Sequence, residues 1–227
     1  MADHFYNATK LSTEHTTTPK LHLKEDNRNK TSAPYNRPFT MKEVHTAVHS
    51  MRNSAPGPDK ICPDMIKHLT NSNLRCLQYL FNKIWTQRHL PLAWKEAYII
   101  PIHKPDKNKF QPISYRPISL TNVLCKIMEK MISSRLSQEL ENSAALDRFQ
   151  SGFRRHRSTI DNLLRLQQEI LDGFAQNELT VCVFFDIEKA FDQINRQAIL
   201  DNLCNLGFCG NLAHFVLDFL TDRNFRV

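Results

Sequence analysis

The chain has 227 residues, of which 41% are hydrophobic and 23% are charged, and its formal net charge at pH 7 is +7. This hydrophobic fraction indicates a packed core rather than a disordered polypeptide, and the length is typical of one or two domains. No apolar run approaches the roughly 20 residues of a membrane span and no basic-then-apolar leader opens the chain, so we expect an intracellular protein, nuclear or cytoplasmic, without a membrane partner.

The first third of the chain is predicted to be a polar lead-in followed by helices. Residues 1–37 are rich in Thr, Asn and Lys and show no apolar period, which is typical of a flexible segment. Thr40 and Glu43 have the spacing of a capping box, and apolar residues at helical spacing follow them. Pro63 suits the first turn of another helix, and a third apolar stripe runs from Leu74 to Trp85. Residues 38–93 are therefore predicted to form a helical region.

Two short strands and a long helix are expected next. Ala97–Ile102 has the composition of a strand, and Pro117–Leu120 is the candidate partner. The segment between them, KPDKNKFQPIS, is a basic loop. Apolar residues from Leu124 to Ile132 then recur at the spacing of a long amphipathic helix.

The last part of the chain mixes helices with one very apolar strand. Ser158 and Asp161 have the spacing of a second capping box, before a further apolar helical stripe. Val181–Ile187 reads as a buried strand, and helices are expected at about 196–206, closed by Gly207, and at 211–221. Helices outnumber strands, so the predicted class is α+β.

The six cysteines and the distribution of charge narrow the chemistry. The cysteines are scattered without a CxxC pair, which favours reduced core thiols over a zinc or disulfide framework. Residues 88–135 carry nine Lys or Arg against three acids, and 148–157 carry four Arg and no acid. Residues 158–227 carry five basic against ten acidic side chains. A groove for phosphates beside a site for cations fits this pattern, although an ordinary surface with uneven charge fits it too.

The strand-end Asp186 is the best candidate for chemistry. A buried carboxylate needs a partner, and one held at a strand end can bind Mg²⁺, which prefers oxygen ligands and is often shared with phosphates. Glu188 and Asp192 follow, but a surface position and a turn or helix start are the simpler interpretations of these two. P-loop, GxGxxG, GxSxG and HExxH motifs do not occur, which disfavours Rossmann, kinase-like, α/β-hydrolase and zinc-protease functions.

Five short segments stand out in order along roughly residues 55 to 192. They are APGPDKI (55–61), WKEAYIIPIHK (94–104), YRPISL (115–120), FQSGFRRHRST (149–159) and FFDIEKAFD (184–192). Together they resemble the reverse transcriptase of a non-LTR retrotransposon of the jockey type. One such segment would be a weak signal, but five in the family's order are specific.

The resemblance assigns roles to particular residues. Asp186 matches the first metal-binding aspartate of the palm, with the backbone carbonyl of Ile187 as a further oxygen ligand, and the implied cofactor is Mg²⁺. Phe191 matches the aromatic steric gate that lies under the sugar and rejects a 2′-OH. Lys104 and Arg116 match fingers residues that bind the incoming deoxynucleoside triphosphate.

Arg154 and Arg157 match the motif that follows the fingers strands. For these two side chains, contact with the template backbone and local scaffolding are both open. The implied partners of the whole are an RNA template, a DNA primer and deoxynucleoside triphosphates.

The fold implied by the resemblance is a right-hand polymerase, with residues 94–227 as fingers and the first part of the palm. The aromatic-Ala-Asp-Asp hairpin, which carries the second metal carboxylate and pairs with the Asp186 strand, does not occur in the sequence, and neither does a thumb. We therefore expect a fragment that does not polymerise alone. The alternatives are a non-catalytic RNA-binding remnant of the element and, without supporting phosphate motifs, a Mg²⁺-dependent phosphatase that uses Asp186 and Glu188.

Overall fold

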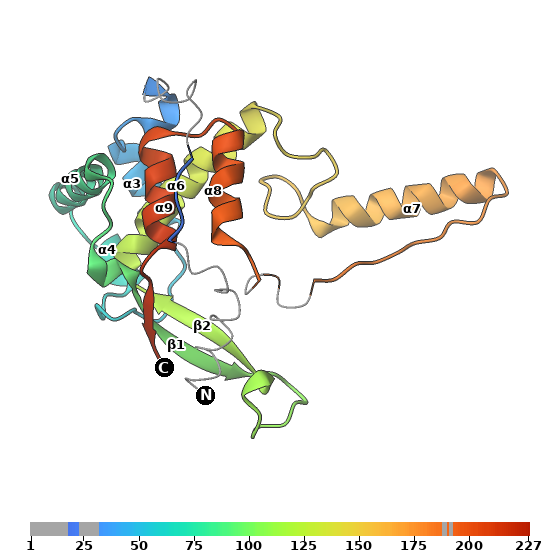
Figure 1. The fold of residues 1–227 in the computed structure, drawn as a ribbon, viewed down its shortest axis with the longest axis horizontal. Coiled ribbons are helices and arrows are strands. Elements are labelled where there is room, and N and C mark those ends of the chain that lie inside the picture. Colours follow the sequence, from blue (N-terminus) through green and yellow to red (C-terminus); the bar gives the residue numbers. More distant parts are fainter. Residues whose placement is uncertain (1–17, 23–31, 188–189, 191–192) are drawn as a thin grey trace. The chain divides into compact units, whose positions relative to one another are not determined.

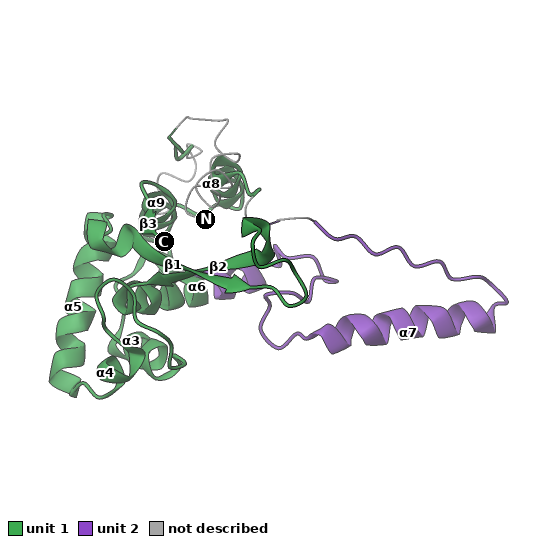
Figure 2. Ribbon diagram, turned by 90° about the horizontal axis from the view of Figure 1, so that it is seen from below, with its two compact units in different colours: residues 1–135, 191–227 green, residues 136–190 purple. Residues whose placement is uncertain are grey.

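The computed structural model describes residues 18–22, 32–187, 190 and 193–227. The chain divides into two compact units, which Figure 2 colours separately: unit 1 comprises residues 1–135 and 191–227, and unit 2 comprises residues 136–190. The sequence predicted a polar lead-in over residues 1–37, a helical region over 38–93 and the start of the polymerase fold over 94–227. This division remains a prediction.

The described residues form helices and one small sheet, which confirms the mixed α+β class (Figure 1). Short 3₁₀ turns connect some of these elements. The α-helices are α3 (Met41–His49), α4 (Pro63–Lys67), α5 (Asn71–Gln87), α6 (Val123–Asn142), α7 (Thr159–Ala175), α8 (Arg196–Asn205) and α9 (Gly210–Leu220). The strands are β1 (Glu96–His103), β2 (Tyr115–Thr121) and β3 (Asn224–Arg226), and the 3₁₀ turns are η2 (Pro34–Asn36), η3 (Leu92–Lys95) and η4 (Pro112–Ser114).

The sheet of unit 1 has the order β2-β1-β3. β1 and β2 pair with each other, as the sequence predicted, and the structure shows that they are antiparallel. β3 joins β1 in parallel, with Ala97 opposite Phe225. The loop that contains Gly57 passes so close to the end of β2 that a Cβ atom at this position would lie 2.5 Å from the carbonyl carbon of Thr121. Only glycine allows this approach of backbone to backbone.

The helices of unit 1 follow their sequence signals closely. The capping box at Thr40 is formed, with the Thr40 N–H donating to the Glu43 carboxylate at 2.8 Å, and it begins α3. Pro63 opens α4. Gly207, with φ of +87°, follows the end of α8, and α8 and α9 then lie side by side (Figure 1).

A buried arginine holds the helical core together. Arg135 on α6 is 9% exposed, and its guanidinium donates to both carboxylate oxygens of Glu43, at 2.7 and 3.0 Å. The same guanidinium lies 4.3 Å from the ring centroid of Phe39. It also donates to three backbone carbonyls in the segment before α3, those of Tyr35, Arg37 and Pro38.

The charge state of Glu43 is fixed by this arginine. Burial by itself raises the pKa of the Glu43 carboxyl, but hydrogen bonds from Arg135 and Thr40 outweigh burial and lower the pKa to about 2. The pair is therefore ionised throughout the neutral and mildly acidic range.

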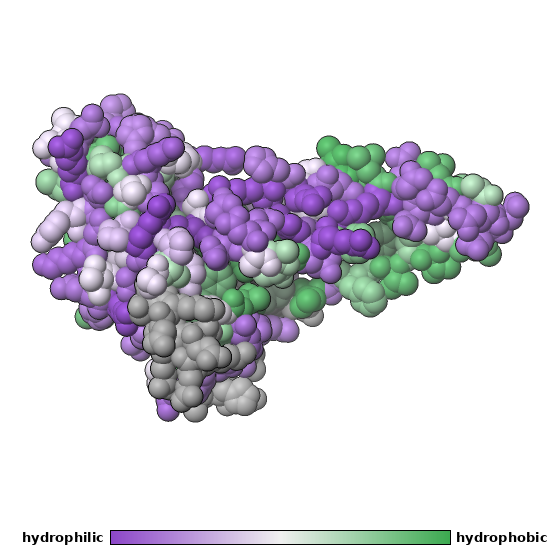
Figure 3. Space-filling view, turned by 90° about the horizontal axis from the view of Figure 1, so that it is seen from above, coloured by the Kyte–Doolittle hydropathy of each residue, from purple (hydrophilic) through white to green (hydrophobic). Residues whose placement is uncertain are grey.

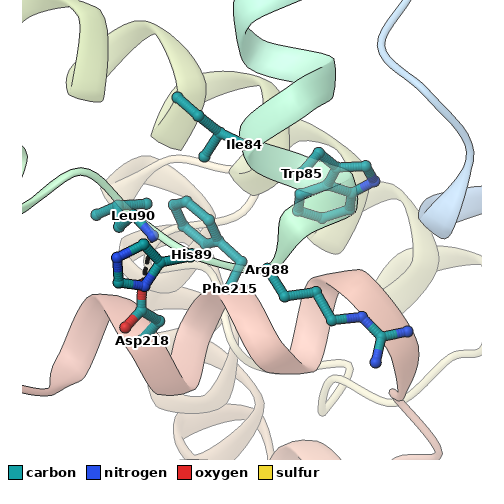
Figure 4. Close-up of a pocket in the computed structure, with 7 residues that line it drawn as sticks. All are labelled: Ile84, Trp85, Arg88, His89, Leu90, Phe215 and Asp218. Atoms are coloured by element: carbon teal, nitrogen blue, oxygen red, sulfur yellow. Dashed lines mark hydrogen bonds and ion pairs between the residues drawn. The ribbon is translucent and has the colours of Figure 1, made fainter.

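A second buried ion pair joins η3, which precedes β1, to α9. Lys95, 2% exposed, donates to the Asp218 carboxylate at 2.6 Å, and the N–H of Leu90 donates to the other oxygen at 2.5 Å. The neighbouring pocket, shown in Figure 4 with residues such as Trp85 and Phe215, leaves no space for a water-sized molecule. These residues therefore pack α5 against α9 and do not form a ligand site.

Unit 2 contains the end of α6, a loop, α7 and the extended segment that runs back along α7 (Figures 1 and 2). The predicted capping box begins α7, with the Ser158 N–H donating to Asp161 at 2.6 Å. The apolar stripe of α7 is not buried, however: Leu163 is 63% and Phe174 70% exposed. Figure 3 shows apolar side chains at the surface of this part of the chain.

The predicted strand over Val181–Ile187 is wrong for this structure. These residues form neither helix nor strand, and their apolar side chains are exposed, with Phe185 at 92%. A strand exists only where its backbone groups pair with a neighbour. No described segment pairs with residues 181–187, so their high β-propensity produces only an extended chain.

The cysteine prediction is partly wrong. Cys125, Cys204 and Cys209 are buried, and burial strongly raises the pKa of the Cys125 thiol. Cys76 and Cys182, in contrast, are exposed.

Among the described residues, no helix combines the length and apolar character needed to cross a membrane.

We expect the substitution Arg135→Met to lower the free energy of unfolding by about 3 kcal/mol at neutral pH, because it leaves the Glu43 carboxylate without its buried partner. The folded pKa of Glu43, about 2, lies below an unfolded value of about 4.3. The pair's contribution is therefore complete above about pH 4.5 and is lost as the pH falls through 2. Urea unfolding of both proteins at several pH values measures the difference, which should shrink over this window.

The exposed Lys130, on the same helix, provides a matched control, since its ammonium donates to the backbone carbonyl of Ser50 rather than to a carboxylate. Lys130→Met should change stability by less than about 0.5 kcal/mol. A loss for Arg135→Met that stayed constant from pH 7 to pH 2 would contradict the role given to Glu43.

Candidate functional site

The β1–β2 hairpin positions the two predicted phosphate-binding cations. The register places Arg116 directly opposite Ile102, and Lys104 follows Ile102 by two residues. Because side chains alternate along a strand, Lys104 and Arg116 start from the same face of the hairpin. The Arg116 side chain is exposed and that of Lys104 is half-buried. Both residues therefore lie at the same end of the β1–β2 hairpin, and their role in binding a phosphate stays a prediction.

The loop between the two cations is held by several hydrogen bonds. The Lys104 N–H donates to the Ser114 carbonyl at 2.7 Å, and the Lys104 ammonium donates to the Ile113 carbonyl at 3.0 Å. The Tyr115 hydroxyl donates to the Lys109 carbonyl at 2.9 Å. An ammonium has three N–H donors, so Lys104 can bind a phosphate oxygen while it keeps its carbonyl partner.

Asp186 lies in unit 2, near the end of the extended segment that follows α7, and its side chain is exposed. Ile187 beside it is 69% exposed and does not lie in a strand. The predicted gate Phe191 lies outside the described residues, and so do Glu188 and Asp192. Within the described ranges, no three His, Cys, Asp or Glu side chains gather as a metal site.

Arg154 is engaged in holding its own loop. Its Nε and Nη2 donate to the two carboxylate oxygens of Glu141, at 2.8 and 2.6 Å, and its Nη1 donates to the carbonyls of Asp147 and Gln150. The hydrogen bonds from Arg154 lower the pKa of the Glu141 carboxyl. Of the two roles that the sequence left open, this geometry supports scaffolding for Arg154.

Arg157 differs from Arg154 in its surroundings. Its side chain is exposed, and it influences Glu141 only through its charge, which also lowers the pKa of that carboxyl. The assignment of Arg157 to nucleic acid stays a prediction.

Sequence reasoning missed the two phenylalanines of the same loop. Phe149 lies between two guanidinium groups, with Arg148 at 4.4 Å and Arg165 at 5.1 Å from its ring centroid. Phe153 is 97% exposed. The available signal was the alternation of aromatic and basic residues in FQSGFRRHR, a composition typical of nucleic-acid-binding loops.

A family model described as reverse transcriptase (RNA-dependent DNA polymerase) matches residues 102–225. The chain therefore belongs to the reverse transcriptase family, which confirms the resemblance carried by the five segments. It is 35% identical, over 189 residues and 83% of its length, to the RNA-directed DNA polymerase from mobile element jockey of Drosophila melanogaster. It is 33% identical, over 192 residues and 84% of its length, to the probable RNA-directed DNA polymerase from transposon BS of the same species.

These relatives are much longer than this chain. The matched regions amount to 20% of the jockey polymerase and 21% of the transposon BS protein. The chain thus spans about one fifth of the length of the curated relatives it matches.

We expect Arg154→Ala to loosen the loop over residues 147–157, because it removes a bidentate ion pair and two bonds to backbone carbonyls. Amide hydrogen exchange in this loop should become at least about tenfold faster, measured by mass spectrometry. Arg157→Ala, a matched loss of one arginine from the same loop, should leave the exchange unchanged. Equal effects of the two substitutions would contradict the division of roles.

Proposed function

We propose that this chain supplies the fingers and the first part of the palm of an RNA-directed DNA polymerase of a non-LTR retrotransposon. The reaction is attack of a primer 3′-OH on the α-phosphate of a deoxynucleoside triphosphate, directed by an RNA template. The observation that carries the proposal is the β1–β2 hairpin, which presents Lys104 and Arg116 from one face at the two ends of a basic loop.

The chemistry of these two cations suits a triphosphate. Arg116 has a planar guanidinium that can donate two parallel hydrogen bonds to phosphate oxygens, whereas Lys104 acts as a compact point charge. Loop residues Lys107 and Lys109 add further positive charge at the same end of the hairpin. In this proposal, Phe191 lies under the sugar and excludes a ribonucleotide by contact with its 2′-OH.

Reverse transcriptases generally use a divalent metal ion, and we propose Mg²⁺ because the assigned donors are oxygens. The Asp186 carboxylate and the Ile187 carbonyl are two such donors. The described residues do not complete a metal site around them. In this proposal the second carboxylate belongs to the aromatic-Ala-Asp-Asp hairpin, which does not occur in these 227 residues, so the fragment is proposed to be inactive alone.

A second candidate function is RNA binding without catalysis. The observation that favours it is the positive charge of residues 88–135 and 148–157, which does not depend on a completed metal site. RNA affinity that falls with salt would be common to both candidates. Only DNA synthesis separates them.

We expect Asp186→Asn to reduce DNA synthesis by roughly a thousandfold or more, because an amide binds a divalent cation much less well than a carboxylate does. The assay is primer extension on an RNA template with a chimera in which residues 1–227 replace the matching part of the jockey polymerase. Glu188→Gln is the control, and it should retain activity. Full activity of Asp186→Asn would refute the assignment of Asp186, and an inactive parent chimera would favour the non-catalytic candidate.

The steric-gate assignment predicts a change in sugar selectivity. In the same chimera, we expect Phe191→Ala to raise the use of ribonucleotides relative to deoxynucleotides by at least about tenfold, since the ring no longer meets the 2′-OH. Incorporation of each nucleotide type is measured separately. If ribonucleotides stay as poorly used as before, Phe191 is not the gate.

A further inference from the structure

We propose that the loop over residues 147–157, here called the Phe153 loop, binds single-stranded RNA by stacking a base on the Phe153 ring. The inference rests on the proposed function, because it names the surface by which unit 2 contacts the template. It concerns a residue to which neither the metal site nor the nucleotide site assigns a role.

The backbone conformation at Phe153 directs its ring into solvent. Phe153 has a φ of +60°, an unusual conformation for a residue other than glycine, and it is 97% exposed. Its neighbour Gly152 has no heavy atom within 4 Å of an ideal Cβ position, so the tip of the loop is open on this side too. A ring in this position offers its flat faces to another flat group.

The loop beneath the ring is already ordered. Arg154 connects it to Glu141, and the Ser151 hydroxyl donates to the Asn162 side chain at 2.9 Å. The Arg165 guanidinium donates to the carbonyls of Phe149 and Arg148 while it lies over the Phe149 ring. A ligand that binds such a loop loses little conformational entropy of the loop itself, which favours affinity.

The charge around Phe153 suits a phosphate chain. Residues 148–157 carry four arginines and no acid, and Glu141 neutralises Arg154. The positive charge of Arg148 and Arg157, on the two sides of the aromatic ring in sequence, can therefore attract phosphates. An aromatic face flanked by cations is the arrangement that binds unpaired nucleotides without sequence preference.

A base must be unpaired to offer its face to Phe153. Double-stranded RNA keeps its bases stacked and is bound by its shape and its backbone. The occupant that the ring and the charges favour is therefore a single strand, and RNA is the strand that the proposed polymerase copies.

The test is the affinity of the 227-residue chain for a fluorescent single-stranded RNA of mixed sequence, measured by anisotropy. Phe153→Ala should weaken binding about tenfold, which is a usual loss for one stacked base. Phe153→Tyr should keep the affinity, and Phe153→Leu should lose as much as Phe153→Ala, because leucine has apolar bulk but no flat ring. Phe174→Ala, at another exposed phenylalanine of unit 2 (70% exposed against 97% for Phe153), should have no effect.

The decisive comparison uses an abasic sugar–phosphate oligomer of the same length as the RNA. On this probe, wild type and Phe153→Ala should bind equally, because only phosphate contacts remain. Equal affinity of the two proteins for intact RNA would overturn the proposal, as would a leucine variant that binds like wild type, since that result indicates an apolar protein contact. Single-stranded DNA bound more tightly than RNA would overturn the choice of RNA.

Failure of this inference can be separated from failure of the proposed polymerase. If Phe153→Ala leaves RNA affinity unchanged but the jockey chimera still extends primers, only the stacking role is lost. If RNA binding depends on Phe153 but the chimera is inactive, the Phe153 loop is an RNA site and the catalytic assignment falls.

Discussion

The guanidinium of Arg135 is the point on which the helical part of unit 1 depends. It lies inside the core, where an unpaired cation would be strongly destabilising, so each of its donors needs an acceptor. Glu43 supplies two carboxylate oxygens, and the segment before α3 supplies three backbone carbonyls. The arginine donates to these carbonyls as a neighbouring strand would do in a sheet.

The same side chain also links packing to polarity. Its flat face lies over Phe39, and Phe39 packs with Trp85 at 5.0 Å between ring centroids. Trp85 in turn contacts Phe215 of α9, at 6.2 Å. Phe39 and Trp85, far apart in sequence, therefore both lie near the Arg135 guanidinium, and Phe215 of a third segment packs on Trp85.

Local signals predicted unit 1 well, and a non-local requirement explains what they missed. Capping boxes, proline at a helix start and glycine after a helix act within a few residues, and each gave the correct helix boundary to within about a turn. Strand formation at Val181–Ile187 depends on a partner elsewhere, and sequence composition reports only the tendency to pair. The exposed apolar face of α7 follows the same logic, because a helical stripe indicates a buried face without identifying the surface that covers it.

The candidate site also has a part that local sequence predicts and a part that depends on distant partners. Two short strands and the loop between them place Lys104 and Arg116 at one end of a hairpin. The position of this pair could therefore be predicted from local sequence. The roles of Arg154 and Arg157 could not be separated in this way, since both are arginines of one motif. Their surroundings differ because Glu141, at the end of α6, accepts two hydrogen bonds from the Arg154 guanidinium. A shared motif therefore identifies positions, but the partner of each side chain decides whether a residue of the motif acts on a ligand or holds its own loop.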